Sequence, residues 1–301
     1  MLHNDKELFE QIVLRTSDAL GIEAGIVEKD YFVTVFLKQL VAQYPNIIFK
    51  GGTSLSKCYK LINRFSEDID LNVLGETKPS ESQRRKLRDA VVGAIDTLNF
   101  SLSNSDDIYS RRDFNKYVID YPTVFTASHL KPKLVVETAV FFRAYPTIKM
   151  EAGSYIYDYL SQNSFESIIE QYNLQPFELN VQTAERTFVD KLFAIGDYYL
   201  SRNVTEHSRH IYDVYKLLTV VEINDTLKEL AEEVREERKP HKTCLSAQDD
   251  IDMNALIHEI VEMNAFKDDY EEITTSLLFE TVDYETVIES LNVVIRSGLF
   301  S

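Results

Sequence analysis

The sequence predicts an α+β fold, with a mixed or antiparallel sheet in the first part of the chain and a mainly helical C-terminal part. Three observations carry this prediction. A strand, a glycine turn, a helix and a second strand are expected between residues 47 and 71, further strand patterns occur at residues 114–121 and 134–140, and helical periodicity dominates from residue 183 onward. We therefore expect two domains, formed by residues 1–180 and 181–301.

Helices flank the first strands. Residues 4–19 place apolar side chains at helical spacing, and a long apolar helix is expected over residues 26–42, ending before Pro45. Residues 81–98 show a further amphipathic pattern. In the C-terminal part, the same periodicity predicts helices over residues 184–200, 209–218, 252–266 and 286–299.

The most informative stretch is FKGGTSLSKCYKLINRFSEDIDL, residues 49–71. Residues 47–49 read as a short strand, and Gly51 and Gly52 as a tight turn. Thr53 and Ser54 are suited to cap a helix that runs to about residue 63. In the strand expected over residues 68–71, side chains alternate between the two faces, so Asp68 and Asp70 point the same way.

These parts indicate nucleotidyl-transfer chemistry. Paired carboxylates at a strand end suit Mg²⁺, a cation that takes oxygen ligands and also binds substrate phosphates. A glycine turn lets the backbone approach a phosphate, and a helix N-terminus offers N–H groups to it. With 49 Asp and Glu in 301 residues, about 8 acidic-x-acidic pairs arise by chance. The pair is therefore informative through its surroundings, and an ordinary helix–strand unit with a solvated acidic end is the alternative.

Glu137 is the single charge in the apolar strand pattern of residues 134–140, which is expected to pair antiparallel with residues 114–121. Burying an unpaired carboxylate is expensive. Glu137 should therefore lie at a sheet edge, pair with a cation or bind a metal.

The string Gly51-Gly52-Thr53-Ser54-Leu55 and the string Arg64-Phe65-Ser66-Glu67-Asp68-Ile69-Asp70 resemble the signature of the AbiEii/AbiGii-type toxin nucleotidyltransferases. This family belongs to the DNA polymerase β-like nucleotidyltransferase superfamily. Glu28-Lys29-Asp30-Tyr31, Glu185 with Lys191-Leu192, and Arg209-His210-Ile211-Tyr212-Asp213 resemble its other motifs. The resemblance covers about residues 20–220 in ordered patches.

The resemblance implies a polymerase β-like core in residues 1–180 and Mg²⁺-dependent transfer of a nucleotidyl group from an NTP, with two metal ions expected. Asp68, Asp70 and Glu137 would hold the metal, although many family members have Asp at the third position. Gly51, Gly52, Thr53 and Ser54 would bind the nucleotide phosphates.

Lys191 would contact the triphosphate, and Asp213 would orient Lys191 or the nucleotide. A salt bridge between two helices is the alternative interpretation of Lys191 and Asp213. Lys50 and Arg64 flank the turn, where each would either help to bind phosphate or be solvated.

The resemblance also implies a toxin of a toxin–antitoxin or phage-defence system, with a tRNA 3′ end as acceptor and a cognate antitoxin as partner. Two other interpretations stay open. One is transfer to the hydroxyl of a protein or a small molecule, and the other is a non-catalytic module that binds a partner.

Composition limits the classes of partner. The net charge of −17 argues against broad, nonspecific binding of nucleic acid. Two local basic clusters occur nonetheless, one formed by residues 84–86 with Arg88 and the other by Arg111, Arg112, Lys116, Lys131 and Lys133. No apolar run is long enough to span a membrane, and residues 1–11 lack the apolar core of a signal peptide. Cys58 and Cys244 show no metal-type spacing, which favours a reducing cytoplasm.

Overall fold

The computed structural model describes residues 1–75, 78–109, 112–126 and 132–300. Arg111 and Lys131 of the second basic cluster lie outside these residues. The chain divides into two compact units, one formed by residues 1–60 and 66–182 and the other by residues 61–65 and 183–301. Residues 61–65, which lie between α3 (Gly51–Lys57) and the Asp68–Asp70 strand in the sequence, thus belong to the second unit. The chain returns to the first unit at Ser66. The division into a nucleotidyltransferase domain of residues 1–180 and a helical domain of residues 181–301 stays a prediction.

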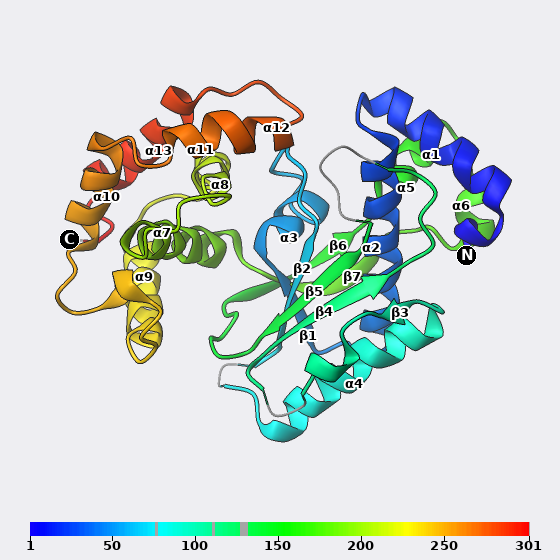
Figure 1. Cartoon of the computed structure of the whole chain (residues 1–301), viewed down its shortest axis with the longest axis horizontal. Helices are drawn as coiled ribbons and strands as arrows, with labels where there is room; N and C mark the ends of the chain where they lie inside the picture. Colours follow the sequence, from blue (N-terminus) through cyan, green and yellow to red (C-terminus); the bar gives the residue numbers. More distant parts are fainter. Residues whose placement is uncertain (76–77, 110–111, 127–131, 301) are drawn as a thin grey trace. The chain divides into compact units, whose positions relative to one another are not determined.

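The first unit is built on a seven-stranded sheet with the strand order β3-β4-β5-β2-β1-β7-β6 (Figure 1). The β2–β5 and β1–β7 pairs are parallel, and the other neighbouring pairs are antiparallel. The predicted α+β class with a mixed sheet is confirmed. The strands are β1 (Ile47–Lys50), β2 (Asp68–Val73), β3 (Ser101–Leu102), β4 (Phe114–Asp120), β5 (Leu134–Ala139), β6 (Thr147–Ala152) and β7 (Phe177–Gln182).

The helices of the first unit have clear start and stop signals. Asp5 caps the first α-helix by accepting from the Leu8 N–H, and Gly21 ends that helix in the left-handed region. Ser80 and Gln83 form a reciprocal capping box at the start of the helix over Glu81–Thr97. The helices are η1 (Leu2–Asn4), α1 (Lys6–Leu20), α2 (Ala24–Gln43), α3 (Gly51–Lys57), α4 (Glu81–Thr97), η2 (Ser105–Asp107), α5 (Tyr155–Gln162) and α6 (Glu166–Tyr172).

The two faces of the sheet differ in chemistry. Ile69 and Leu71 of β2 and Val136 of β5 join the buried core together with apolar side chains of α2 and α4. Because side chains alternate along a strand, Asp68, Asp70 and Glu137 project from the opposite face. The hydrophobic pattern therefore fixes the register that presents the carboxylates together.

The structure corrects the expected bounds of α3. This helix begins at Gly51 and ends at Lys57, whereas the sequence predicted a helix capped by Thr53 and Ser54 and reaching about residue 63. Both hydroxyls lie inside the helix, where the Ser54 Oγ donates to the Gly51 carbonyl at 2.8 Å. Lys60 has a positive φ of 52°, which is incompatible with continued helix.

The second unit is helical in its described part apart from an isolated bridge between Arg64 and Leu278. α7 packs on α8, α9 and α10, and α13 packs on α8 and α10. Its helices are α7 (Ala184–Leu200), α8 (Arg209–Leu217), α9 (Asp225–Arg238), η3 (Leu245–Ala247), α10 (Met253–Glu262), α11 (Lys267–Asp269), η4 (Tyr270–Thr274), α12 (Thr275–Leu277) and α13 (Tyr284–Ser297). Among the described residues of both units, every helix is too short or too polar to cross a bilayer.

Two helical glycines should respond oppositely to alanine. A Cβ on Gly196 of α7 would lie 2.7 Å from the Ser246 Cβ, and Ser246 is held by hydrogen bonds to the Phe193 carbonyl and the Asp197 carboxylate. Gly196→Ala should therefore destabilise the protein by about 1–3 kcal/mol, despite the better helix propensity of alanine. Thermal or urea denaturation would measure the change.

Gly93→Ala in α4 is the matched control. A Cβ there meets the end of the exposed Gln43 side chain, which can move away. We expect a stability equal to or up to about 1 kcal/mol above the wild type. Equal destabilisation by both substitutions would contradict this account of α7 packing.

Candidate active site

The centre of the candidate site is the approach of Asp70 to Gly51. A Cβ built on Gly51 would lie 2.1 Å from the Asp70 Oδ2, and Gly51 has a φ of +76°. Both the backbone conformation and the neighbouring carboxylate therefore require glycine at this position. Asp68 stands two residues away on the same face of β2, so two carboxylates border the glycine turn, as the sequence predicted.

Charged residues form a row across four neighbouring strands. Asp70 of β2 is aligned with Lys50 of β1 on one side and with Glu137 of β5 on the other. Glu137 is in turn aligned with Lys116 of β4. Because aligned residues share a face, the four side chains form one row, with the two acids in the middle and a lysine at each end.

Glu137 pairs with a cation. The Lys116 Nζ lies 2.9 Å from the Glu137 Oε1. The hydrogen bond to Glu137 raises the pKa of Lys116, and the charges of Asp68 and Asp70 add to the rise. Of the three expectations for Glu137, the edge position is wrong, because β5 lies between β4 and β2 in the sheet. The cation partner is what the structure shows.

The carboxylates suit a metal that substrate helps to hold. Among the residues that the structure describes, no three Asp, Glu, His or Cys side chains converge as metal ligands would. Mg²⁺ is commonly bound by one or two carboxylates plus substrate phosphates, and it keeps several waters. Asp68 and Asp70 beside the glycine turn fit that mode.

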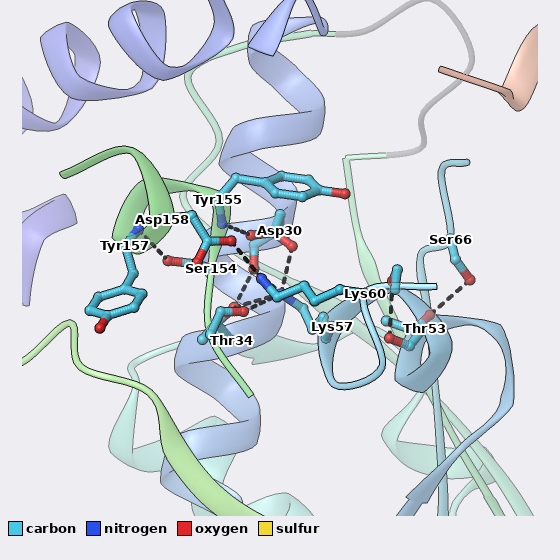
Figure 2. A network of polar contacts seen from close by, with 12 residues as sticks. Asp30, Thr34, Thr53, Lys57, Lys60, Ser66, Ser154, Tyr155, Tyr157 and Asp158 are labelled. Atoms are coloured by element: carbon cyan, nitrogen blue, oxygen red, sulfur yellow. Dashed lines mark hydrogen bonds and ion pairs between the residues drawn. The ribbon is translucent and has the colours of Figure 1, made fainter. Parts of the chain in front are cut away.

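The hydroxyls beside the turn already have partners within the protein. The Thr53 Oγ1 donates to the Asp68 carbonyl at 2.5 Å. It also lies 2.9 Å from the Ser66 Oγ (Figure 2). The Ser54 hydroxyl bonds to its own helix, and both residues are buried. Thr53 therefore links α3 to the first residue of β2.

Lys191 and Asp213 lie in the second unit, where they form a buried cluster with Arg64. Arg64 donates to both Asp213 carboxylate oxygens at 2.7 Å, and the Lys191 Nζ lies 2.5 Å from the Asp213 Oδ2. The exposed fractions are 2% for Arg64, 0% for Asp213 and 7% for the Lys191 side chain. The helix–helix salt bridge considered for Lys191 and Asp213 is thus present. Of the two alternatives for Arg64, the solvated one is wrong.

The cluster holds both signs of charge in a dry environment. Burial alone would raise the pKa of Asp213, but the charges of Arg64 and Lys191 outweigh it and hold that pKa well below its usual range. Burial lowers the pKa of Lys191, and Asp213 opposes that shift. Two cations share one carboxylate, so the cluster carries a net positive charge.

Lys116 was not recognised as the partner of Glu137. Sequence reasoning placed Lys116 in a basic cluster, yet the alternation of the strand over residues 114–121 could have placed it on the face of Glu137 once the pairing register was known. Other members of the basic clusters are also paired: Arg84 with Asp113, Arg88 with Asp89, and Lys133 with Asp120.

A glycine turn after one strand, with two carboxylates on the adjacent strand of a mixed sheet, is the arrangement that the sequence led us to expect of a nucleotidyltransferase. The family described as "Nucleotidyl transferase AbiEii toxin, Type IV TA system" matches residues 35–290. The chain therefore belongs to the AbiEii nucleotidyltransferase toxin family. This match runs further toward the C-terminus than residues 20–220, over which the motifs indicated a resemblance, and it leaves out residues 28–31.

A solved structure supports the fold. MenT4, a nucleotidyltransferase toxin from Mycobacterium tuberculosis H37Rv, is similar with a TM-score of 0.52 and 16% sequence identity, covering 96% of this chain and 89% of that chain. A search among curated proteins found no match.

Asp213→Asn should destabilise the protein by about 3–5 kcal/mol, because it leaves the buried Arg64 and Lys191 charges without their carboxylate. Since the native pKa of Asp213 is lowered, its contribution is complete above the ordinary aspartate pKa of about 4 and is lost as pH falls toward the native value. The free energies of unfolding of the wild type and of Asp213→Asn, measured between pH 3 and pH 7, should approach each other as the pH falls. Asp249→Asn, which touches an exposed pair with Lys239, should change little.

Proposed function

We propose that this protein is a Mg²⁺-dependent toxin that transfers a nucleotidyl group from an NTP to the 3′ end of a tRNA. Family membership supports the transferase activity and the NTP substrate. The observation that carries the metal assignment is the contact between the Asp70 carboxylate and Gly51, with Asp68 on the same strand face. A triphosphate on the glycine turn would lie beside both carboxylates.

Each site residue has a role in this proposal. Asp68 and Asp70 would hold the metal, and Glu137, which is aligned with Asp70 and paired with Lys116, would lie beside the attacking hydroxyl. The main chain of Gly51, Gly52, Thr53 and Ser54 receives the phosphates, because the two side-chain hydroxyls already bond within the protein. When bound, Mg²⁺ supplies charge neutralisation for the phosphates and a lower pKa for a coordinated hydroxyl.

The reaction is a substitution at phosphorus. The acceptor hydroxyl oxygen bonds to the α-phosphorus, the bond between that phosphorus and the oxygen bridging to the β-phosphate breaks, and pyrophosphate leaves. The hydroxyl proton passes to solvent. Lys191, a point charge in a cluster with net positive charge, supports binding of the triphosphate, and Asp213 orients Lys191.

The acceptor and partner follow from the same reasoning. A single-stranded tRNA end presents a terminal hydroxyl without the need to open a duplex. The family's type IV toxin–antitoxin description supports a cognate antitoxin. A role in phage defence is the biological context that we propose for such a pair. Buried free Cys58 and Cys244 are compatible with action in a reducing cytoplasm.

Incubation with labelled NTPs, Mg²⁺ and total cellular RNA or protein tests the proposal. We expect label in tRNA, loss of labelling with EDTA and recovery with added Mg²⁺. Asp70→Asn should lower incorporation at least about 100-fold while the fold is kept, since it removes metal-binding charge without removing volume. Asp120→Asn, an exposed acid on β4, is the control and should label as the wild type does.

Label in protein would contradict the tRNA acceptor while leaving the transferase assignment in place. Absence of label in both fractions, together with tight binding of an antitoxin, would indicate a non-catalytic module. Full activity of a folded Asp70→Asn variant would refute the metal role.

Lys191→Ala should raise the KM for NTP by about tenfold, equivalent to about 1.4 kcal/mol of binding. The fold should survive, because Arg64 still neutralises Asp213 through two hydrogen bonds. Steady-state kinetics at varied NTP concentration measures the effect. An unchanged KM in a folded variant would restrict Lys191 to the salt bridge.

A further inference from the structure

The Glu28-Lys29-Asp30 sequence of α2 lies outside the family match and has no role in the transfer chemistry above. Its side chains are nevertheless largely buried: the exposed fraction is 0% for Glu28, 1% for Lys29 and 11% for the Asp30 side chain. Charged groups are seldom buried unless they have partners of opposite charge or hydrogen bonds. The partners of these residues therefore indicate what the sequence holds in place.

Asp30 holds α3 and the start of α5. Its Oδ1 lies 2.6 Å from the Nζ of Lys57, the last residue of α3, and its Oδ2 accepts from the Tyr155 N–H at 2.8 Å (Figure 2). Lys57 is itself buried and also donates to the Thr34 hydroxyl at 2.6 Å and to the Asp30 carbonyl at 3.1 Å. The end of α3 is thus fixed to α2 by an ion pair with little access to water.

Lys29 holds the residue that precedes the metal-binding strand. It forms an ion pair with Glu67, which directly precedes Asp68. Glu28 accepts from the N–H groups of Val124 and Phe125 in the connection between β4 and β5. Consecutive residues of one helix therefore reach three different segments that border the sheet.

Thr53 closes the arrangement. It lies one helical turn before Lys57 on α3 and bonds to Ser66 and to the Asp68 carbonyl, on either side of Glu67. The contacts form a closed ring: α2 to α3 through Asp30 and Lys57, α3 to β2 through Thr53, and β2 back to α2 through Glu67 and Lys29. We call this ring, made by Lys29, Asp30, Thr53, Lys57, Ser66 and Glu67, the α2–α3–β2 frame.

We infer that the α2–α3–β2 frame sets the distance between the glycine turn and the Asp68–Asp70 pair, and that Asp30 and Lys57 are positioning residues for nucleotidyl transfer. Gly51 begins the helix that Lys57 ends, and Asp68 and Asp70 follow Glu67 directly. Movement of α3 relative to β2 would separate phosphates from metal. This inference rests on the proposed function for its catalytic consequence, while its structural consequence can be measured without turnover.

The test separates positioning from simple stability. Asp30→Asn leaves Lys57 as a buried unpaired charge and should lower the Tm by roughly 5–10 °C. Asp30→Asn combined with Lys57→Met removes both charges and should recover part of that loss. The double variant should still show faster amide hydrogen exchange in residues 51–57, by about tenfold, and transfer slower by about 100-fold, the effect of a misplaced reacting group.

The chain offers a matched control at the same place. Lys60 and Asp158 form an ion pair at 2.5 Å between the segment after α3 and helix α5, but their side chains are 50% and 33% exposed (Figure 2). Lys60→Met combined with Asp158→Asn should leave exchange in residues 51–57 and the transfer rate at wild-type values.

Two results would overturn the frame: unchanged exchange in residues 51–57 of the double variant, or wild-type transfer by it. Failure of the proposed function appears differently, as absence of transfer by the wild-type protein. In that case hydrogen exchange alone decides, and faster exchange of α3 in the double variant but not in the control supports the frame.

Discussion

The candidate site depends on one close approach, that of the Asp70 carboxylate to the backbone of Gly51. The carboxylate occupies the place that any other residue at position 51 would need for its Cβ, and the positive φ of Gly51 favours glycine independently. Because glycine has a hydrogen atom in place of a side chain, the Asp70 carboxylate of β2 can lie against the start of α3. In the proposed reaction metal and phosphate must also meet, so this steric constraint would be the basis of that reaction.

The remaining charged residues form two kinds of ion pair, one partly exposed beside the carboxylates of the sheet and one buried in the second unit. In the sheet, Lys116 balances Glu137 at the margin of the carboxylate row, where its side chain is half exposed. In the second unit, Arg64 and Lys191 balance Asp213 in a buried cluster. The first pair can exchange partners with ligands at small cost, whereas breaking the second leaves a buried charge. One sequence motif thus contributes to both places: Arg64 belongs to the buried cluster, and Asp68, only four positions later, belongs to the carboxylates of the sheet.

Local patterns predicted much of the fold. Alternation in residues 68–71 and 134–140 placed the apolar side chains in the core, and helical periodicity located α1, α2, α4 and α7 to within a few residues. The pattern was wrong for α3, whose end depends on contacts made by Lys57 and on the backbone of Lys60. Thr53 and Ser54 have the composition of helix caps, but their hydroxyls bond to Asp68 and Gly51.

The order of residues was enough to place Asp68 and Asp70 on one strand face beside two glycines, because alternation and glycine's conformational range act over a few residues. It also identified the enzyme family through strings of residues in fixed order. Other partners became visible in the folded chain alone: Glu137 faces Lys116, and Arg64 is buried against Asp213. In the same way, Lys29 pairs with Glu67 before β2, and Asp30 pairs with Lys57 of α3. Those partners are separated by 21 to 149 positions, and pairing over such distances follows from strand register and helix packing, which no local pattern specifies.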